Sequence, residues 1–87
     1  MAIELSNILT ISAMEWFEIT GKSKDDYELK GVHCDSTMRG INREFLEEVP
    51  NDAEVVVAYT HSGATEGASG GMNGMVYASG TALIPRK

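Results

Sequence analysis

The stretch AEVVVAYTH, residues 53–61, is followed after a glycine-rich segment by MVYASGTALI, residues 75–84, and these two runs decide the fold class. Both are rich in β-branched and aromatic residues, and successive side chains of a strand point to opposite faces of a sheet. In the first run, Val55, Val57 and Tyr59 share one face, with Val56, Ala58 and Thr60 on the other. In the second, Met75, Tyr77, Ser79, Thr81 and Leu83 alternate with Val76, Ala78, Gly80, Ala82 and Ile84. The pattern predicts a β-hairpin that is apolar on both faces.

A helix is predicted before this hairpin. The apolar residues fall three or four positions apart, which places them on one helical face: Met38, Ile41, Phe45 and Val49, widened by Leu46. The charged residues Arg39, Arg43, Glu44, Glu47 and Glu48 occupy the other side. Ser36 or Thr37 is suited to cap the helix start, and Pro50 ends it. The small residues at the centre of the last strand let this helix approach closely.

The first third of the chain gives weaker signals. Residues 27–34 alternate loosely and predict a strand, preceded by a charged turn over 22–26. Residues 13–21 are ambiguous, because Ser12 and Glu15 fit a helix capping box while Trp16, Phe17 and Ile19 favour a strand. We interpret 13–21 as a strand that ends at Gly21. Residues 3–11 fit either an edge strand or a disordered lead-in.

Together these segments predict an α+β fold in a single domain, residues 1–87. We expect a two-layer domain of the β-α-β-β type, with one main helix packed on an antiparallel sheet of about four strands. The two closing strands are apolar on both faces, and one helix covers only one face of a small sheet. The other face would expose an apolar patch, so we expect a homo-oligomer.

Composition excludes some partners. The chain of 87 residues has 7 basic and 13 acidic residues, for a net charge of −6. Such a surface repels phosphate backbones and anionic lipids, so neither nucleic acid nor a membrane surface is an expected partner. The N-terminus lacks the features of a signal peptide, and no run approaches the length of a membrane span. A single cysteine, Cys34, forms no internal disulfide, which indicates a cytoplasmic setting.

The glycine-rich segment does not fit a phosphate-binding loop. Its glycines match neither the Walker spacing nor G-x-G-x-x-G, and no lysine follows until Lys87. It also leads into a strand, so no helix N-terminus is available to hold an anion. The simpler interpretation is a hairpin connection that closes with a turn at Asn73 and Gly74.

Three residues are candidate metal ligands: His33, Cys34 and His61. Asp35 and the thioethers of Met72 and Met75 lie nearby in sequence, and a divalent or soft metal ion would be the cofactor. If 27–34 is a strand, His33 and Cys34 point to opposite faces, so one chain offers at most one of them to a pocket. A buried thiol with two surface imidazoles is therefore the simpler interpretation, and a site shared between subunits is the alternative.

No catalytic constellation is evident. Cys34 beside His33 and Ser62 beside His61 are adjacent pairs, and adjacent residues rarely aim their side chains at each other. We therefore expect no catalytic residues, no further cofactor-binding residues and no enzymatic activity.

Three segments carry a resemblance to a known family: residues 53–57, Ala78 to Leu83 (ASGTAL) and EWFEITGKS, residues 15–23. With these segments, and mainly in its C-terminal third, the chain resembles the YbjQ-like family of small bacterial proteins described as heavy-metal-binding. The resemblance implies a β-α-β-β fold assembled into a ring, commonly a pentamer, without an established enzymatic activity. It assigns no ligand residues, because the matched SGTA sequence contains no good metal ligand.

These observations lead to two functional hypotheses. The first is a non-enzymatic, oligomeric protein that binds a small ligand or a metal ion. The alternative is a structural or protein-interaction module that contacts its partner through the glycine-rich loop, residues 62–74. A thermal shift with small metabolites or divalent metals would favour the first hypothesis.

Overall fold

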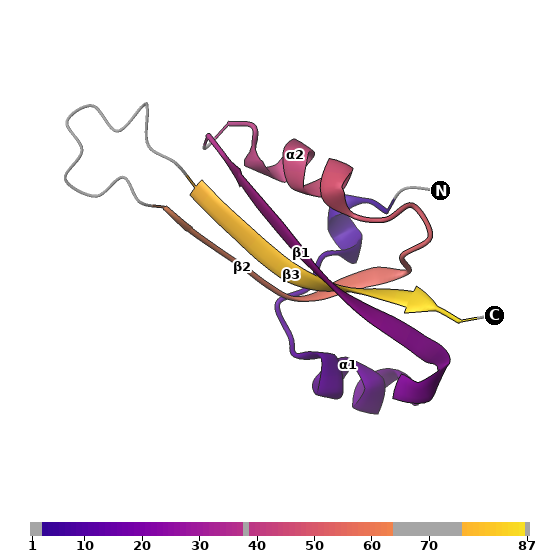
Figure 1. Cartoon of the computed structure of the whole chain (residues 1–87). Helices are drawn as coiled ribbons and strands as arrows, with labels where there is room; N and C mark the ends of the chain where they lie inside the picture. The colour runs from indigo at the N-terminus through magenta and orange to yellow at the C-terminus, as the bar shows by residue number, and fades with distance from the viewer. Residues whose placement is uncertain (1–2, 38, 64–75, 87) are drawn as a thin grey trace.

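A computed structural model describes residues 3–37, 39–63 and 76–86 of the chain. In these ranges the fold is α+β, with two α-helices and a three-stranded antiparallel sheet of order β1-β3-β2 (Figure 1). The elements follow in the order η1 (Leu5–Asn7), α1 (Ala13–Thr20), η2 (Lys24–Asp26), β1 (Tyr27–Ser36), α2 (Ile41–Glu48), β2 (Val55–Gly63) and β3 (Val76–Pro85). The predicted fold class is confirmed, with three strands where about four were expected. Met38 and residues 64–75, including Met72, Met75 and most of the glycine-rich loop, lie outside the described ranges.

The segment that was expected to form the fourth strand forms helix α1 instead, so the strand interpretation of 13–21 is wrong. Ser12 caps the helix by accepting a hydrogen bond from the Glu15 amide at 3.1 Å. Gly21 ends it in the left-handed conformation, with φ of 74° and its N–H donating to the Phe17 carbonyl. Both caps outweigh the strand propensity of the aromatic residues between them. The helix buries the adjacent residues Trp16 and Phe17 on one side, whereas a strand would have sent them to opposite faces.

Helix α2 packs on one face of the sheet as expected, and we call this the α2 face. The predicted helix residues Ile41, Phe45 and Val49 are buried there. The strand residues that pack with them come from all three strands: Val32, Val56, Val76, Ala78, Ala82 and Ile84. A Cβ built on Gly80 would lie 2.7 Å from Cγ1 of Val56 and 3.5 Å from Cζ of Phe45. Close approach of the helix and its neighbours thus requires glycine at this position.

A β-bulge interrupts β2. Val57 pairs with Thr81 and Thr60 pairs with Ser79, so β2 holds one residue more than β3 over this interval. Ala58 adopts φ of 55°, in the left-handed region that alanine rarely occupies. The extra residue reverses the alternation, and Tyr59 consequently packs on the α2 face against Phe45. The prediction that Tyr59 shares a face with Val55 and Val57 is therefore wrong.

The N-terminal segment lies along the outer edge of β2. Leu9 donates to the Val56 carbonyl at 2.8 Å, and Ala58 and Tyr59 donate to the carbonyls of Ile11 and Leu9. A single parallel bridge joins Ile8 to Val56, so the segment is neither a full strand nor a free lead-in. The segment thus forms hydrogen bonds with the outward-facing backbone groups of β2 around the bulge.

Helix α1 packs on the opposite face of the sheet, which we call the α1 face. Trp16 and Phe17 contact the buried residues Tyr27, Val55, Val57 and Leu83. The rings of Trp16 and Tyr27 meet edge to face, with centroids 5.6 Å apart. The apolar patch from which oligomerisation was expected is therefore covered, over these residues, by helix α1 of the same chain.

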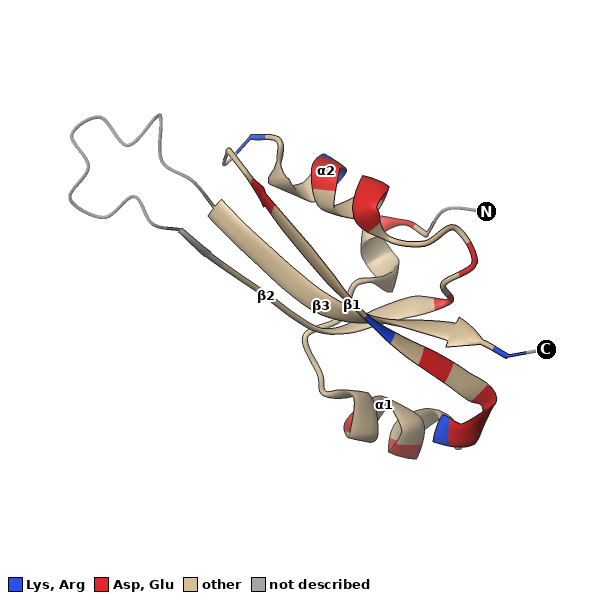
Figure 2. Ribbon diagram, viewed as in Figure 1, with Lys and Arg blue, Asp and Glu red and all other residues tan. Residues whose placement is uncertain are grey.

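Charge is distributed unevenly over these elements. Figure 2 shows acidic residues on both helices and on β1, whereas β3 carries no charged residue between Val76 and Pro85. In the described part of the chain, no helix is long and apolar enough to cross a membrane.

Candidate functional site

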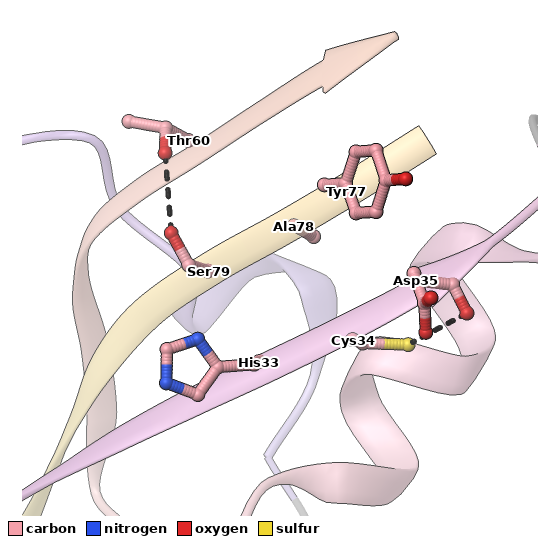
Figure 3. A pocket seen from close by; sticks show the side chains of 7 residues that line it. All are labelled: His33, Cys34, Asp35, Thr60, Tyr77, Ala78 and Ser79. Carbon is pink, nitrogen blue, oxygen red and sulfur yellow. Dashed lines mark hydrogen bonds between the residues drawn. The ribbon is translucent and has the colours of Figure 1, made fainter. Parts of the chain in front are cut away.

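Helix α1 covers only one end of the α1 face. The other end, which we call the open half, is hollowed into a groove of about 390 Å³ (Figure 3). The side chains of this half come from all three strands: His33 and Asp35 on β1, Thr60 on β2, and Tyr77 and Ser79 on β3. Cys34 and Ala78 also border the groove, but they alternate with these residues and belong to the α2 face.

Three of the groove residues form a row across the sheet. Ser79 pairs with His33 on one side and with Thr60 on the other, so the three side chains share one face. The hydroxyls of Thr60 and Ser79 lie 3.4 Å apart, within hydrogen-bond distance. Thr60 belongs to this row because of the bulge at Ala58, which moved Tyr59 to the other face. The row offers two hydroxyls and an imidazole, groups that both donate and accept hydrogen bonds.

Tyr77 and Asp35 form a second row nearer the end of the sheet. They are paired in the register of β1 and β3 and lie side by side on the same face. Tyr77 is 51% exposed, which is unusual for a large residue in the central strand of a sheet. An exposed aromatic ring beside hydroxyl and carboxylate groups offers a stacking surface together with polar contacts.

The three predicted metal ligands do not converge within one chain. His33 lies on the α1 face and Cys34 on the α2 face, as the alternation predicted. Cys34 and His61 share the α2 face but are separated by β3, because each is paired with Ala78 from opposite sides. Among the described residues, no group of three His, Cys, Asp or Glu side chains is placed to hold a metal ion.

The environment of Cys34 also disfavours a thiolate. Burial raises the pKa of its thiol, and the carboxylates of Glu44 and Glu48 on α2 raise it further. Metal ions and electrophiles react with the thiolate, so a raised pKa weakens both kinds of chemistry at neutral pH. Cys34 is half-buried against the core of the α2 face, which fits the simpler interpretation of a buried thiol.

A smaller pocket of about 150 Å³ lies where the N-terminal segment meets α2. Leu5, Ile8, Asn42, Phe45 and Tyr59 line it. Burial raises the pKa of the Tyr59 phenol, whose hydroxyl is buried without a hydrogen-bond partner among the described residues. The volume suits a few water molecules better than a metabolite.

A polar cluster fastens the C-terminal end of α1 to the sheet. Glu54 accepts hydrogen bonds from Lys22 at 2.9 Å and from the Tyr27 hydroxyl at 2.7 Å. Lys22 also lies over the Trp16 ring, 5.7 Å from its centroid. The hydrogen bond from Lys22 lowers the pKa of the Glu54 carboxyl. This cluster stabilises the covered end of the α1 face and leaves the open half untouched.

The sequence placed Tyr77 and Ser79 together but did not single out the groove. Thr60 was assigned to the opposite face, since nothing in the sequence marks the bulge, and Asp35 was considered only as a metal ligand. Comparison with protein-family models, with curated proteins and with solved structures finds no match to this chain. The resemblance to the YbjQ-like family, including the pentameric ring that it implies, stays a prediction.

Proposed function

We propose that the protein is a non-enzymatic binding protein whose small-molecule ligand occupies the groove of the open half. The observation that carries this proposal is the row of polar side chains beside an exposed aromatic ring: His33, Thr60 and Ser79 with Tyr77. The groove volume of about 390 Å³ falls within the range of small-ligand sites.

The residues of the groove define the chemistry of the ligand. Tyr77 presents a ring for stacking, and the hydroxyls and imidazole suit a ligand that both donates and accepts hydrogen bonds. Asp35 and the net charge of −6 disfavour an anion. We therefore expect a neutral or cationic polar molecule with a planar ring. Among the described residues, no hydrogen bond joins the His33 imidazole to the hydroxyl of Ser79 or Thr60, as activation of a nucleophile would require, and the role that we propose is binding without turnover.

The proposal is tested by calorimetric binding of ring-containing polar fragments, first chosen by thermal shift. Tyr77→Ala and Ser79→Ala should each weaken binding by about tenfold or more, because each loses a contact worth about 1.4 kcal/mol. Met14→Ala on the exposed side of α1, where the side chain is 79% exposed, is the matched control and should bind normally. Binding that survives both groove variants would place the ligand elsewhere.

Metal binding is the second candidate, and it requires more than one subunit. Cys34 and His61 lie on the same face of the sheet, so one subunit would contribute these two ligands and another would complete the set. Cys34→Ser should then weaken zinc or copper(I) binding substantially. Equal metal uptake by the wild type and the variant would remove Cys34 from the site.

The interaction-module alternative uses residues 62–74, of which only the backbone of Ser62 and Gly63 in β2 is described.

A further inference from the structure

Among the described residues, the outer edge of β1 has no paired strand. The sheet has the order β1-β3-β2, and the outer edge of β2 is taken by residues 8–11, whereas β1 has a described neighbour only on its β3 side. Arg86 donates to the Asp26 carbonyl in register with the strand pairing, so even-numbered residues of β1 bond to β3. The odd-numbered residues direct their N–H and C=O groups outward. In the described part of the chain, no hydrogen bond reaches these groups at Leu29 or Gly31.

Two residues on this edge are not explained by packing within one chain. Leu29 is an apolar residue that is 43% exposed, and the residues on either side of it are charged. Gly31 occupies the middle of a strand, where glycine weakens the structure, yet a Cβ there would meet only Nε2 of His33 at 3.8 Å. A glycine of this kind is typical of a place where another backbone approaches closely.

We infer that a second copy of the chain pairs with this edge, antiparallel, about a twofold axis at Leu29. In this register the two Leu29 residues exchange backbone hydrogen bonds, and Tyr27 of each copy faces Gly31 of the other. Glu28 of each copy then lies opposite Lys30 of the other, in the non-hydrogen-bonded positions where cross-strand side chains come closest. The two three-stranded sheets become one sheet of six strands.

Charge selects this register among the alternatives. A twofold axis at Lys30 would place Lys30 against its own copy, and an axis at Glu28 would do the same for that carboxylate. An axis at Gly31 would pair Lys30 with Val32 and Glu28 with Cys34. Of these neighbouring registers, only the axis at Leu29 forms two opposite-charge pairs and one apolar contact.

The ends of the paired segment are compatible with this arrangement. The Tyr27 carbonyl already accepts a hydrogen bond from Nε of Arg86 at 3.1 Å, and a carbonyl oxygen has a second lone pair for Gly31 of the other copy. Five paired residues bury less than the roughly 1,200 Å² of a standard stable interface, so the dimer should be weak and should form at micromolar concentration. The open half of each copy lies beyond the paired segment, and its groove stays accessible.

A charge-swap series tests this inference by sedimentation velocity of the full chain across a range of concentrations. The wild type should shift from its 9.4 kDa monomer towards a dimer as concentration rises. Lys30→Glu should lower the association constant at least tenfold, because each pair becomes two facing carboxylates. The double variant Glu28→Lys with Lys30→Glu should restore dimerisation. Both side chains are exposed, so circular dichroism should show that every variant folds.

Three results would overturn the inference. The first is a wild type that stays monomeric throughout, and the second is a dimer that Lys30→Glu leaves unchanged. The third is a ring of higher order such as a pentamer, since a closed ring uses two different surfaces and a twofold pair uses one surface twice.

Discussion

The two halves of the α1 face belong to the same three strands but differ in almost every property. In the covered half, Val55, Val57 and Leu83 are buried beneath Trp16 and Phe17. In the open half, Thr60, Ser79 and Tyr77 are exposed or half-buried and carry hydroxyl groups. The boundary between the halves coincides with the bulge at Ala58. The covered half thus contributes to stability, and the open half is where we propose that the ligand binds, so substitutions should separate the two properties.

The largest expected effect is on the covered half. Trp16→Ala removes the ring that packs on Tyr27 and Leu83, and should lower the free energy of unfolding by about 3–5 kcal/mol. Tyr77→Ala in the open half should change it by less than about 0.5 kcal/mol, because the side chain is already exposed. Urea denaturation of both variants measures the difference. Equal losses would mean that the two halves are not distinct.

The second prediction concerns adjacent residues of β3 that face opposite sides. Gly80→Ala places a Cβ 2.7 Å from Cγ1 of Val56, and should destabilise the protein by about 1–3 kcal/mol. Ser79→Ala alters only the open half and should stay within about 0.5 kcal/mol of the wild type. If Gly80→Ala proves neutral, the packing on the α2 face is looser than described.

The third prediction concerns the bulge at Ala58, which marks the boundary between the two halves. Ala58→Gly should stabilise the protein by roughly 0.5 kcal/mol, because relief of the left-handed strain exceeds the added entropy of the unfolded chain. Ala58→Val should destabilise it, since a β-branched residue tolerates positive φ poorly. Thermal unfolding of both variants gives the sign of each change in stability. A stabilising valine would show that Ala58 is not in the left-handed region.

The smallest expected effect is the pH dependence of the covered half. The hydrogen bond from Lys22 lowers the folded-state pKa of Glu54 below its ordinary value of 4.5. The ionised carboxylate therefore adds stability that is present above the unfolded-state pKa and is lost as the pH falls through the folded-state pKa. Glu54→Gln should flatten this part of the acid-unfolding curve, whereas Glu47→Gln on the exposed side of α2 should not. Identical acid-unfolding curves for the wild type and Glu54→Gln would exclude a contribution of the ionised Glu54 carboxylate to stability.

The sequence predicted the elements whose signals agree with one another. Helix α2 has one apolar face and one charged face, and β3 alternates small and large residues, so the packing of α2 on Ala78, Gly80 and Ala82 could be derived. Helix α1 could not, because its caps at Ser12 and Gly21 compete with the strand propensity of Trp16 and Phe17. In the structure the caps prevail, and the burial of both aromatic residues against the sheet supports the helix.

The candidate site was harder to predict because it depends on register. His33, Thr60 and Ser79 are far apart in the sequence, and their common row requires the strand order as well as the bulge. Bulges of this kind are often marked by glycine, and here the position holds Ala58, which gives no warning. The opposite orientation of His33 and Cys34, in contrast, followed from strand alternation alone.

The most direct test of ligand binding at the open half is an amide chemical-shift map of the ¹⁵N-labelled protein with ring-containing polar fragments. The groove residues His33, Thr60, Tyr77 and Ser79 should shift in a saturable manner, while Trp16, Val57 and Leu83 in the covered half should not. Shifts confined to the covered half, or no saturable shift with any neutral or cationic fragment, would contradict the proposed role of the groove.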